Sequence, residues 1–220
     1  MKNFQNKSSL WILALIVLLL TVMIPQWCLA QDPYLVKNIH PTNDSKPEYL
    51  TNFNGTLYFK AGESTNGEEL WKSDGTESGT VMVKDIWSGS AGSYPEYLTN
   101  VNGTLYFRAN DATNGAELWK SGDTESGTVM VKNIRSGSSG SNPEYLTNVN
   151  GTLYFKANDG TNGKELWKSD GTESGTVLVK DIRSGSNYSY PKYLTNVNGT
   201  LYFQANDERS CGHCLSSLIS

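Results

Sequence analysis

The feature that most constrains the fold of this chain is an internal repeat of 48 residues. The string NGTLYF begins at Asn54, Asn102, Asn150 and Asn198. Residues 84–131 and 132–179 differ at only ten of 48 aligned positions. Repeats of roughly 20 to 50 residues are typical of arrays in which each unit stacks on its neighbours, because one unit alone cannot bury its apolar face.

Each repeat contains four strand-like segments separated by turn residues, here called strands a to d. In the second repeat we expect them at residues 97–101, 104–109, 117–120 and 128–134. Asn102-Gly103 between the first two is the pair that a two-residue hairpin turn favours. Along strand b, Leu105, Phe107 and Ala109 fall on one face and Tyr106 on the other. After residue 30 no segment has a sustained helical period, so the chain is predicted to be all-β.

Four short antiparallel strands per repeat indicate a β-propeller with about four 48-residue, four-stranded blades, the last incomplete. The units lie near residues 36–83, 84–131, 132–179 and, as a partial copy, 180–205, and an additional strand d is expected near Val36. A β-solenoid is the alternative, but its coils usually repeat over fewer residues. Trp71, Trp119 and Trp167 recur within strand c, where we expect them to fill the space between stacked sheets.

Residues 1–30 have the composition of a secretory signal peptide. Lys2 and Lys7 precede an uncharged apolar run from Leu10 to Ile24, and cleavage is expected after Ala30. The run is short for a membrane span, although an uncleaved anchor is the alternative and the only predicted membrane contact. The sequence therefore predicts that residues 31–205 form a propeller domain that is secreted or held at the cell surface.

Residues 206–220 depart from the repeat and are predicted to be an aberrant or unstructured tail. Either residues 215–219 fill the place of strand c, or the chain is a truncated piece of a larger propeller. We favour truncation or a change of reading frame, because the tail shares no sequence with the repeat. Cys211 and Cys214 have CxxC spacing, but neither the βαβ context of a redox motif nor two further zinc ligands are evident. A local disulfide or an incidental pair is therefore expected.

The string ELWKSDGTESGT at 69–80 and 165–176, each copy preceded by NGTLYF, resembles the ELWxxDGT repeat family of secreted bacterial proteins. The copy at 117–128 reads ELWKSGDTESGT and departs from the pattern by exchanging Asp and Gly. The resemblance covers residues 36–205. It implies a propeller-like repeat fold and leaves the activity open, because the family has no established catalytic residues.

Composition and motifs exclude several classes of function. A net charge of −4, or −6 after loss of Lys2 and Lys7, does not fit a nucleic-acid-binding protein. No nucleophile elbow, phosphate loop or zinc-protease motif occurs. Asp74, Glu77, Asp170 and Glu173 recur in the c–d turns, as expected of turn formers and not of a single asymmetric acid/base pair. We predict no catalytic residues, although an enzymatic role stays open.

The b–c loops at 110–115 and 158–163 are rich in Asn, Asp and Thr. They lack the spacing of an EF-hand, so local Asx turns explain them and no cofactor is predicted, with Ca²⁺ as the alternative. The NGT strings also match glycosylation sequons, but Asn-Gly recurs in hairpins without any glycan.

The repeats differ most in the d–a loops, and a binding surface is predicted there. The candidate binding residues are Trp87, Tyr94, Arg135, Arg183 and Tyr190. Exposed aromatic and Arg side chains are enriched at binding surfaces. The predicted function is non-enzymatic recognition or adhesion, with an extracellular glycan or protein as partner. The alternatives are a fragment of a propeller glycan hydrolase or lyase, and a purely structural spacer.

Overall fold

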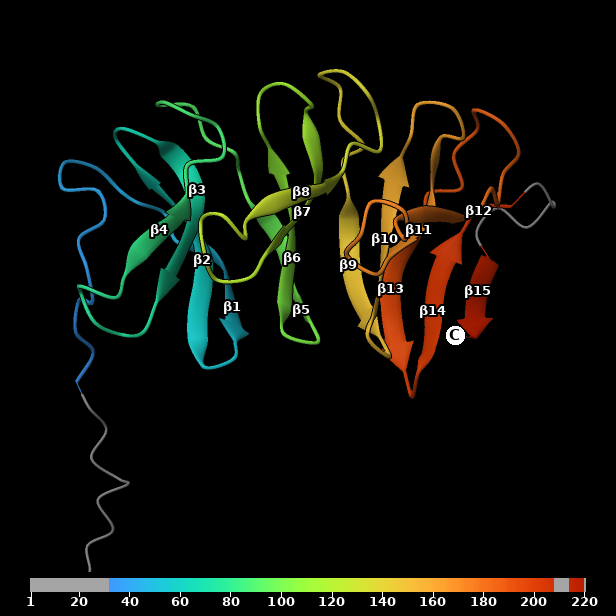
Figure 1. Cartoon of the computed structure of the whole chain (residues 1–220). Coiled ribbons are helices and arrows are strands. Elements are labelled where there is room, and N and C mark those ends of the chain that lie inside the picture. The colour runs from blue at the N-terminus through green and yellow to red at the C-terminus, as the bar shows by residue number, and fades with distance from the viewer. Residues whose placement is uncertain (1–31, 208–213, 220) are drawn as a thin grey trace, which may run out of the picture. The chain divides into compact units, whose positions relative to one another are not determined.

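Residues 32–207 and 214–219 are described by a computed structural model, and all of their regular structure is β-strand (Figure 1). The all-β prediction is confirmed. The chain divides into two units, residues 1–35 and 36–220, and the described part of the first unit contains no strand. The predicted signal peptide lies outside the described residues. Within those residues there is no helix of the length and apolarity that crossing a membrane requires.

The strands form four antiparallel sheets, in which strands adjacent in sequence lie side by side (Figure 1). The first sheet contains β1 (Glu48–Phe53), β2 (Thr56–Glu63), β3 (Gly67–Ser73) and β4 (Val81–Lys84). The second contains β5 (Glu96–Val101), β6 (Thr104–Asn110), β7 (Ala116–Ser121) and β8 (Val129–Lys132). The third contains β9 (Glu144–Val149), β10 (Thr152–Asn158), β11 (Lys164–Ser169) and β12 (Val177–Lys180). The fourth contains β13 (Lys192–Val197), β14 (Thr200–Ala205) and β15 (Cys214–Ile219).

The a–b hairpins turn at the Asn-Gly pairs, as predicted. In the second sheet Asn102 and Gly103 have φ values of 50° and 80°, which the two central residues of such a turn require. The Gly103 amide also donates to Asn100 Oδ1 at 3.0 Å. This turn sets the register of β5 against β6, in which Val101 lies opposite Thr104.

Consecutive sheets share apolar clusters, and strand alternation decides which cluster each side chain joins. Leu105, Phe107 and Trp119 of the second sheet are buried together with Phe53 and Tyr58 of the first. Tyr106 and Leu118, on the opposite face, are buried with residues of the third sheet. The predicted division of β6 into two faces is confirmed, and so is the burial of the three strand-c tryptophans.

Hydrogen bonds from lysines also join the first sheet to the second and the second to the third. Lys84 Nζ donates to the Thr128 carbonyl at 3.0 Å, and Lys132 Nζ donates to the Thr176 carbonyl at 2.9 Å. Tyr58 donates its hydroxyl hydrogen to the Asp123 carboxylate in the next c–d turn. Because these donors cross between sheets, they fix how far one sheet slides along its neighbour.

The expected strand near Val36 is not found, and this prediction is wrong. Residues 36–39 are not part of a sheet, yet Lys37 Nζ donates to the Thr80 carbonyl at 2.8 Å and Ile39 packs on the first sheet. The segment thus repeats the side-chain contacts of a strand d without a strand beside it.

Strand d of the second sheet ends earlier than predicted, and part of the tail, predicted to be aberrant or unstructured, forms a strand in the place of strand c, which was one of the two alternatives for it. Strand d of the second sheet stops at Lys132, because the Ile134 amide donates to a side chain, Glu117, instead of a ladder. In the tail, β15 pairs with β14 in the place of a third strand, with Leu201 opposite Leu218. Cys211 lies outside the described residues, so the expectation for the CxxC pair stays a prediction.

Candidate functional site

A fully buried glutamate near the start of the third strand in each of the first three sheets holds the d–a loop of its own sheet. These residues are Glu69, Glu117 and Glu165. In the second sheet Glu117 accepts hydrogen bonds from the amides of Ile134, Arg135 and Ser141 at 3.2, 3.1 and 2.9 Å. The Ser141 hydroxyl adds a fourth bond at 2.5 Å. We name this arrangement the glutamate latch.

Burial dominates the electrostatics of the latch. It raises the pKa of Glu69 to about 7, although the hydrogen bonds from Ser93, Ile86 and Trp87 work in the opposite direction. Burial likewise raises the pKa of Glu117 and of Glu165. Each described latch is built from backbone amides and one serine, so its chemistry is that of a loop anchor.

The latch was not predicted from the sequence, although the sequence contains its signal. Each ELW string places a charged residue two positions before a buried tryptophan, on the same face of the strand. A serine in the d–a loop follows each of these glutamates 24 residues later, as Ser93, Ser141 or Ser189. A carboxylate on an apolar face requires hydrogen-bond donors, and this recurring serine is one.

The five predicted binding residues lie in three successive d–a loops. Trp87, Arg135 and Arg183 occupy equivalent positions and are half-buried. The amides of Trp87 and Arg135 are donors in the latches of their sheets. Tyr94 and Tyr190 are exposed and have φ values of 51° and 48°.

Backbone hydrogen bonds join the d–a loops to the residues that flank the b–c loops, and we name this edge of the sheets the rim. Local contacts hold two of the five side chains there. Arg135 lies beside Gly160 of the next b–c loop, where a Cβ would come within 3.3 Å of Arg135 Nε. Tyr190 packs edge-on against Tyr188, with ring centroids 5.2 Å apart, and Lys164 Nζ lies 6.0 Å from its ring. The structure therefore places the five residues along one rim, and their joint use as a binding surface stays a prediction.

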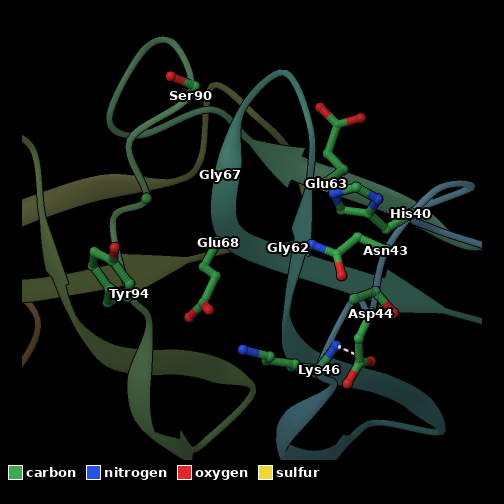
Figure 2. A pocket seen from close by; sticks show the side chains of 12 residues that line it. His40, Asn43, Asp44, Lys46, Gly62, Glu63, Gly67, Glu68, Ser90 and Tyr94 are labelled. Atoms are coloured by element: carbon green, nitrogen blue, oxygen red, sulfur yellow. Dashed lines mark hydrogen bonds between the residues drawn. The ribbon is translucent and has the colours of Figure 1, made fainter.

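A pocket of about 220 Å³ opens on this rim of the first sheet (Figure 2). Tyr94 and Ser90 line it from one d–a loop, and Lys46 and Glu68 extend into it from other segments. Its acids are engaged within the protein: Asp44 accepts from the Lys46 amide at 3.0 Å, and Glu68 pairs with Lys60 at 3.0 Å.

The predicted Asx turns explain the polar b–c loops. Asp111 Oδ1 accepts the amides of Thr113 and Asn114 at 3.0 and 2.7 Å, and Asp159 does the same for Thr161 and Asn162. Across residues 32–207 and 214–219, no group of three or more His, Cys, Asp or Glu residues is arranged to hold a metal ion. Ca²⁺ binding stays the alternative.

A second candidate site is a row of tyrosines on the first strand of each sheet. Its members are Tyr49, Tyr97, Tyr145 and Tyr193. All four have φ between 57° and 59°, a backbone region that bulky residues rarely adopt. The β-ladder register shifts beside each of the three tyrosines in β1, β5 and β13. We name this set the tyrosine row.

The row is partly open to solvent, and its rings contact one another in two pairs, each of which joins neighbouring sheets. Tyr49 and Tyr193 are 40% and 68% exposed, and the other two are half-buried. Ring centroids lie 6.4 Å apart between Tyr49 and Tyr97, and 6.4 Å apart between Tyr145 and Tyr193. Burial, followed by the Glu144 charge from the next sheet, raises the pKa of Tyr97.

An ion pair accompanies each of the first three tyrosines. Lys60 bonds Glu48 at 2.8 Å, Arg108 bonds Glu96 at 3.0 Å and Lys156 bonds Glu144 at 2.7 Å. The Lys156 ammonium also lies 5.0 Å from the centre of the Tyr145 ring, and the Lys60 ammonium lies 5.6 Å from that of Tyr49. Burial opposes the charge of Lys60, but hydrogen bonds to Glu48 and Glu68 outweigh it and raise the pKa of the lysine.

The row was not among the predicted binding residues, because sequence analysis looked for positions that differ between repeats. The tyrosines follow Pro-Glu or Pro-Lys in every copy and so read as ordinary strand residues. Their left-handed backbone is visible only in the structure. Comparison with protein-family models, curated proteins and solved structures found no match.

Proposed function

We propose that this chain is a secreted or cell-surface recognition module that binds an extracellular glycan. Its four sheets would serve as blades of a β-propeller of the ELWxxDGT type. The observation that carries the proposal is the tyrosine row, in which a strained backbone presents the same aromatic ring on every sheet. Strained backbone outside glycine concentrates at functional sites, because it costs about 1–3 kcal/mol per residue and persists only where the surroundings impose it.

The chemistry of the row suits a carbohydrate polymer. Exposed tyrosine rings offer apolar faces for the C–H surface of a sugar, while their hydroxyls and the adjoining Lys–Glu pairs offer hydrogen bonds for sugar hydroxyls. Repeating the same group from sheet to sheet matches a ligand that itself repeats. Several weak contacts along one polymer chain then add to a much stronger attachment.

The d–a loops are the second candidate surface, with Trp87, Tyr94, Arg135, Arg183 and Tyr190 as their binding residues. They differ between sheets, so they would give directional specificity to a glycan or protein ligand. Two arginines on one rim of a chain with an excess of acids favour an anionic group on that ligand.

A propeller glycan hydrolase or lyase is the alternative from another class. Glycoside hydrolysis uses two carboxyl groups about 5 to 9.5 Å apart, one of them available as a general acid. Of the acids on the described rim, Asp111 accepts hydrogen bonds within its own loop and Glu68 pairs with Lys60, and this favours recognition. A purely structural spacer would show no ligand at all.

The experiment compares the binding of wild type and three variants, all secreted, on a glycan array and on cell surfaces. Tyr97→Asn with Tyr145→Asn removes two rings of the row, and Asn is a non-glycine residue that accepts positive φ. Trp87→Ala with Arg135→Ser removes two of the five predicted loop side chains. The third variant, Tyr97→Phe with Tyr145→Phe, keeps the rings and serves as the matched control.

We expect the Asn variant to lose at least about tenfold in affinity, as for loss of aromatic anchors, while the Phe control keeps most of its binding. Loss of binding in the loop variant alone would move the site to the d–a loops. If wild type binds neither array nor cells, the recognition function is wrong and the spacer is favoured.

A further inference from the structure

Equivalent residues on the last sheet and on the inner sheets differ in burial. Tyr58, Tyr106 and Tyr154 are at most 5% exposed, because the following sheet covers them, whereas Tyr202 is 37% exposed. Val197 is 48% exposed, although its counterpart Val149 is fully buried. We name Val197 and Tyr202 the trailing face.

The first sheet shows the same difference on its opposite side. Leu57 is 37% exposed, while its counterparts Leu105, Leu153 and Leu201 are fully buried. Leu50 is 62% exposed, whereas Leu194 at the same place in the fourth sheet is 9% exposed. We name Leu50 and Leu57 the leading face.

The internal interfaces show what covers each face. In the first shared cluster Tyr58 packs with Leu105, in the second Tyr106 packs with Leu153, and in the third Tyr154 packs with Leu201. A trailing face therefore packs against a leading face at every internal junction. Among the described strands, none of β1–β4 makes substantial contact with β13–β15, so both terminal faces stay open.

The strand inventory of the two ends is complementary as well. In the described part of the chain the fourth sheet ends at β15, whereas every other sheet carries a fourth strand beyond its third. Residues 36–39, VKNI, match the strand-d sequence VKDI at 83–86. They already make the strand-d contact to the first sheet through Lys37 and Thr80. The fourth sheet thus lacks a strand d among the described residues, while residues 36–39 next to the first sheet provide an additional strand-d sequence.

We propose that the trailing face of one copy docks on the leading face of a second copy. Tyr202 of the first copy then covers Leu57 of the second, and residues 36–39 of the second copy lie beside β15 of the first. The interface joins two different surfaces, so it generates a ring if the rotation closes and a filament if it does not. The inference rests on the repeat interfaces alone and is independent of ligand binding.

The test measures the mass of the protein, produced from the full chain in a secreting host, by light scattering over a wide range of concentration. Leu57→Glu and Tyr202→Glu each place a charge on one face, at a side chain that is already exposed in the single copy. Val129→Glu is the matched control, because Val129 is 38% exposed and lies on neither face.

We expect wild type and the control to self-associate with rising concentration, and each face variant to associate at least about tenfold more weakly. Mixing the two face variants should restore a pair, because each retains the face that the other lacks. A wild type that is monomeric throughout, or an oligomer that both face variants leave unchanged, overturns the proposal. Circular dichroism of all variants checks that the sheets are intact.

Discussion

The second and fourth sheets contain nearly the same strands a and b but differ in what surrounds them. Tyr106 of the second sheet is 5% exposed and Tyr202 of the fourth is 37% exposed, although both follow a leucine in NGTLYF. Phe107 and Phe203, on the side that a preceding sheet covers, are buried in both. The burial of a side chain in this protein therefore depends on the neighbouring sheet. The same residue contributes more to the free energy of unfolding in an inner sheet than in the last one.

Tyrosine truncation should give the largest contrast between the two sheets. Tyr106→Ala should lower the free energy of unfolding by about 3–5 kcal/mol, the usual cost of deleting a buried aromatic side chain. Tyr202→Ala should cost about 1 kcal/mol or less, because fewer contacts are lost. Urea unfolding at concentrations where the chain is monomeric measures both, and equal costs would show that the fourth sheet is covered in solution.

The glutamate latch distinguishes the sheets in a second way. Glu165 lies opposite Ala157 in the third sheet, whereas Cys214 lies opposite Ala205 at the same place in the fourth. Glu117→Ala should destabilise the protein by about 2–3 kcal/mol, because buried donors lose their acceptor. Glu125→Ala, in an exposed turn of the same sheet, is the control and should change stability by less than about 0.5 kcal/mol. Comparable losses in the two variants would contradict the anchoring role.

The latches should also give stability a distinctive pH dependence. The pKa of Glu69 is raised from 4.5 to about 7, so between these values the folded protein binds more protons than the unfolded chain. The free energy of unfolding should therefore fall as pH rises from about 4.5 to 7 and level off above it. Thermal midpoints in buffers across this range measure the effect, and Glu69→Gln should flatten it. A midpoint that rises through the interval would contradict the assignment.

The smallest effect is expected where the repeats themselves differ. Trp87→Arg combined with Arg135→Trp exchanges equivalent d–a loop residues between two sheets whose latches are alike. Unfolding free energy should change by less than about 0.5 kcal/mol, as at other surface positions. Chemical denaturation of the exchange variant tests this, and a loss above 2 kcal/mol would mean that each side chain is fitted to its own loop.

The repeat and its alternation predicted the strands, the hairpin turns and the two faces of β6, because these depend on local sequence. The exposure of Tyr202 was not predictable in the same way, since it depends on which sheet follows. The left-handed backbone of Tyr97 was not predicted, because an alternating strand pattern does not reveal the φ angle of a single residue. The strand expected near Val36 does not form, because no neighbouring strand pairs with it.

For the candidate sites, variation between repeats led to Trp87 and Arg135, and the structure places both next to latch amides. The same criterion hid Glu117 and Tyr145, which are invariant across their sheets. Some residues that the repeats share serve packing and others are candidates for ligand contact. Only their burial and backbone angles distinguish these two roles.

The glutamate latch has a consequence for what the loops between its contacts are free to become. Glu69 accepts hydrogen bonds from Ile86, Trp87 and Ser93, and the backbone of residues 91–92 lies close against Gly67, so residues 88–90 lie outside both contacts. If loops of other lengths and sequences were grafted between these anchored residues, the positions of their two ends would stay fixed. The fold therefore works as a display frame, on which one loop is exchanged while the adjoining loops keep their geometry.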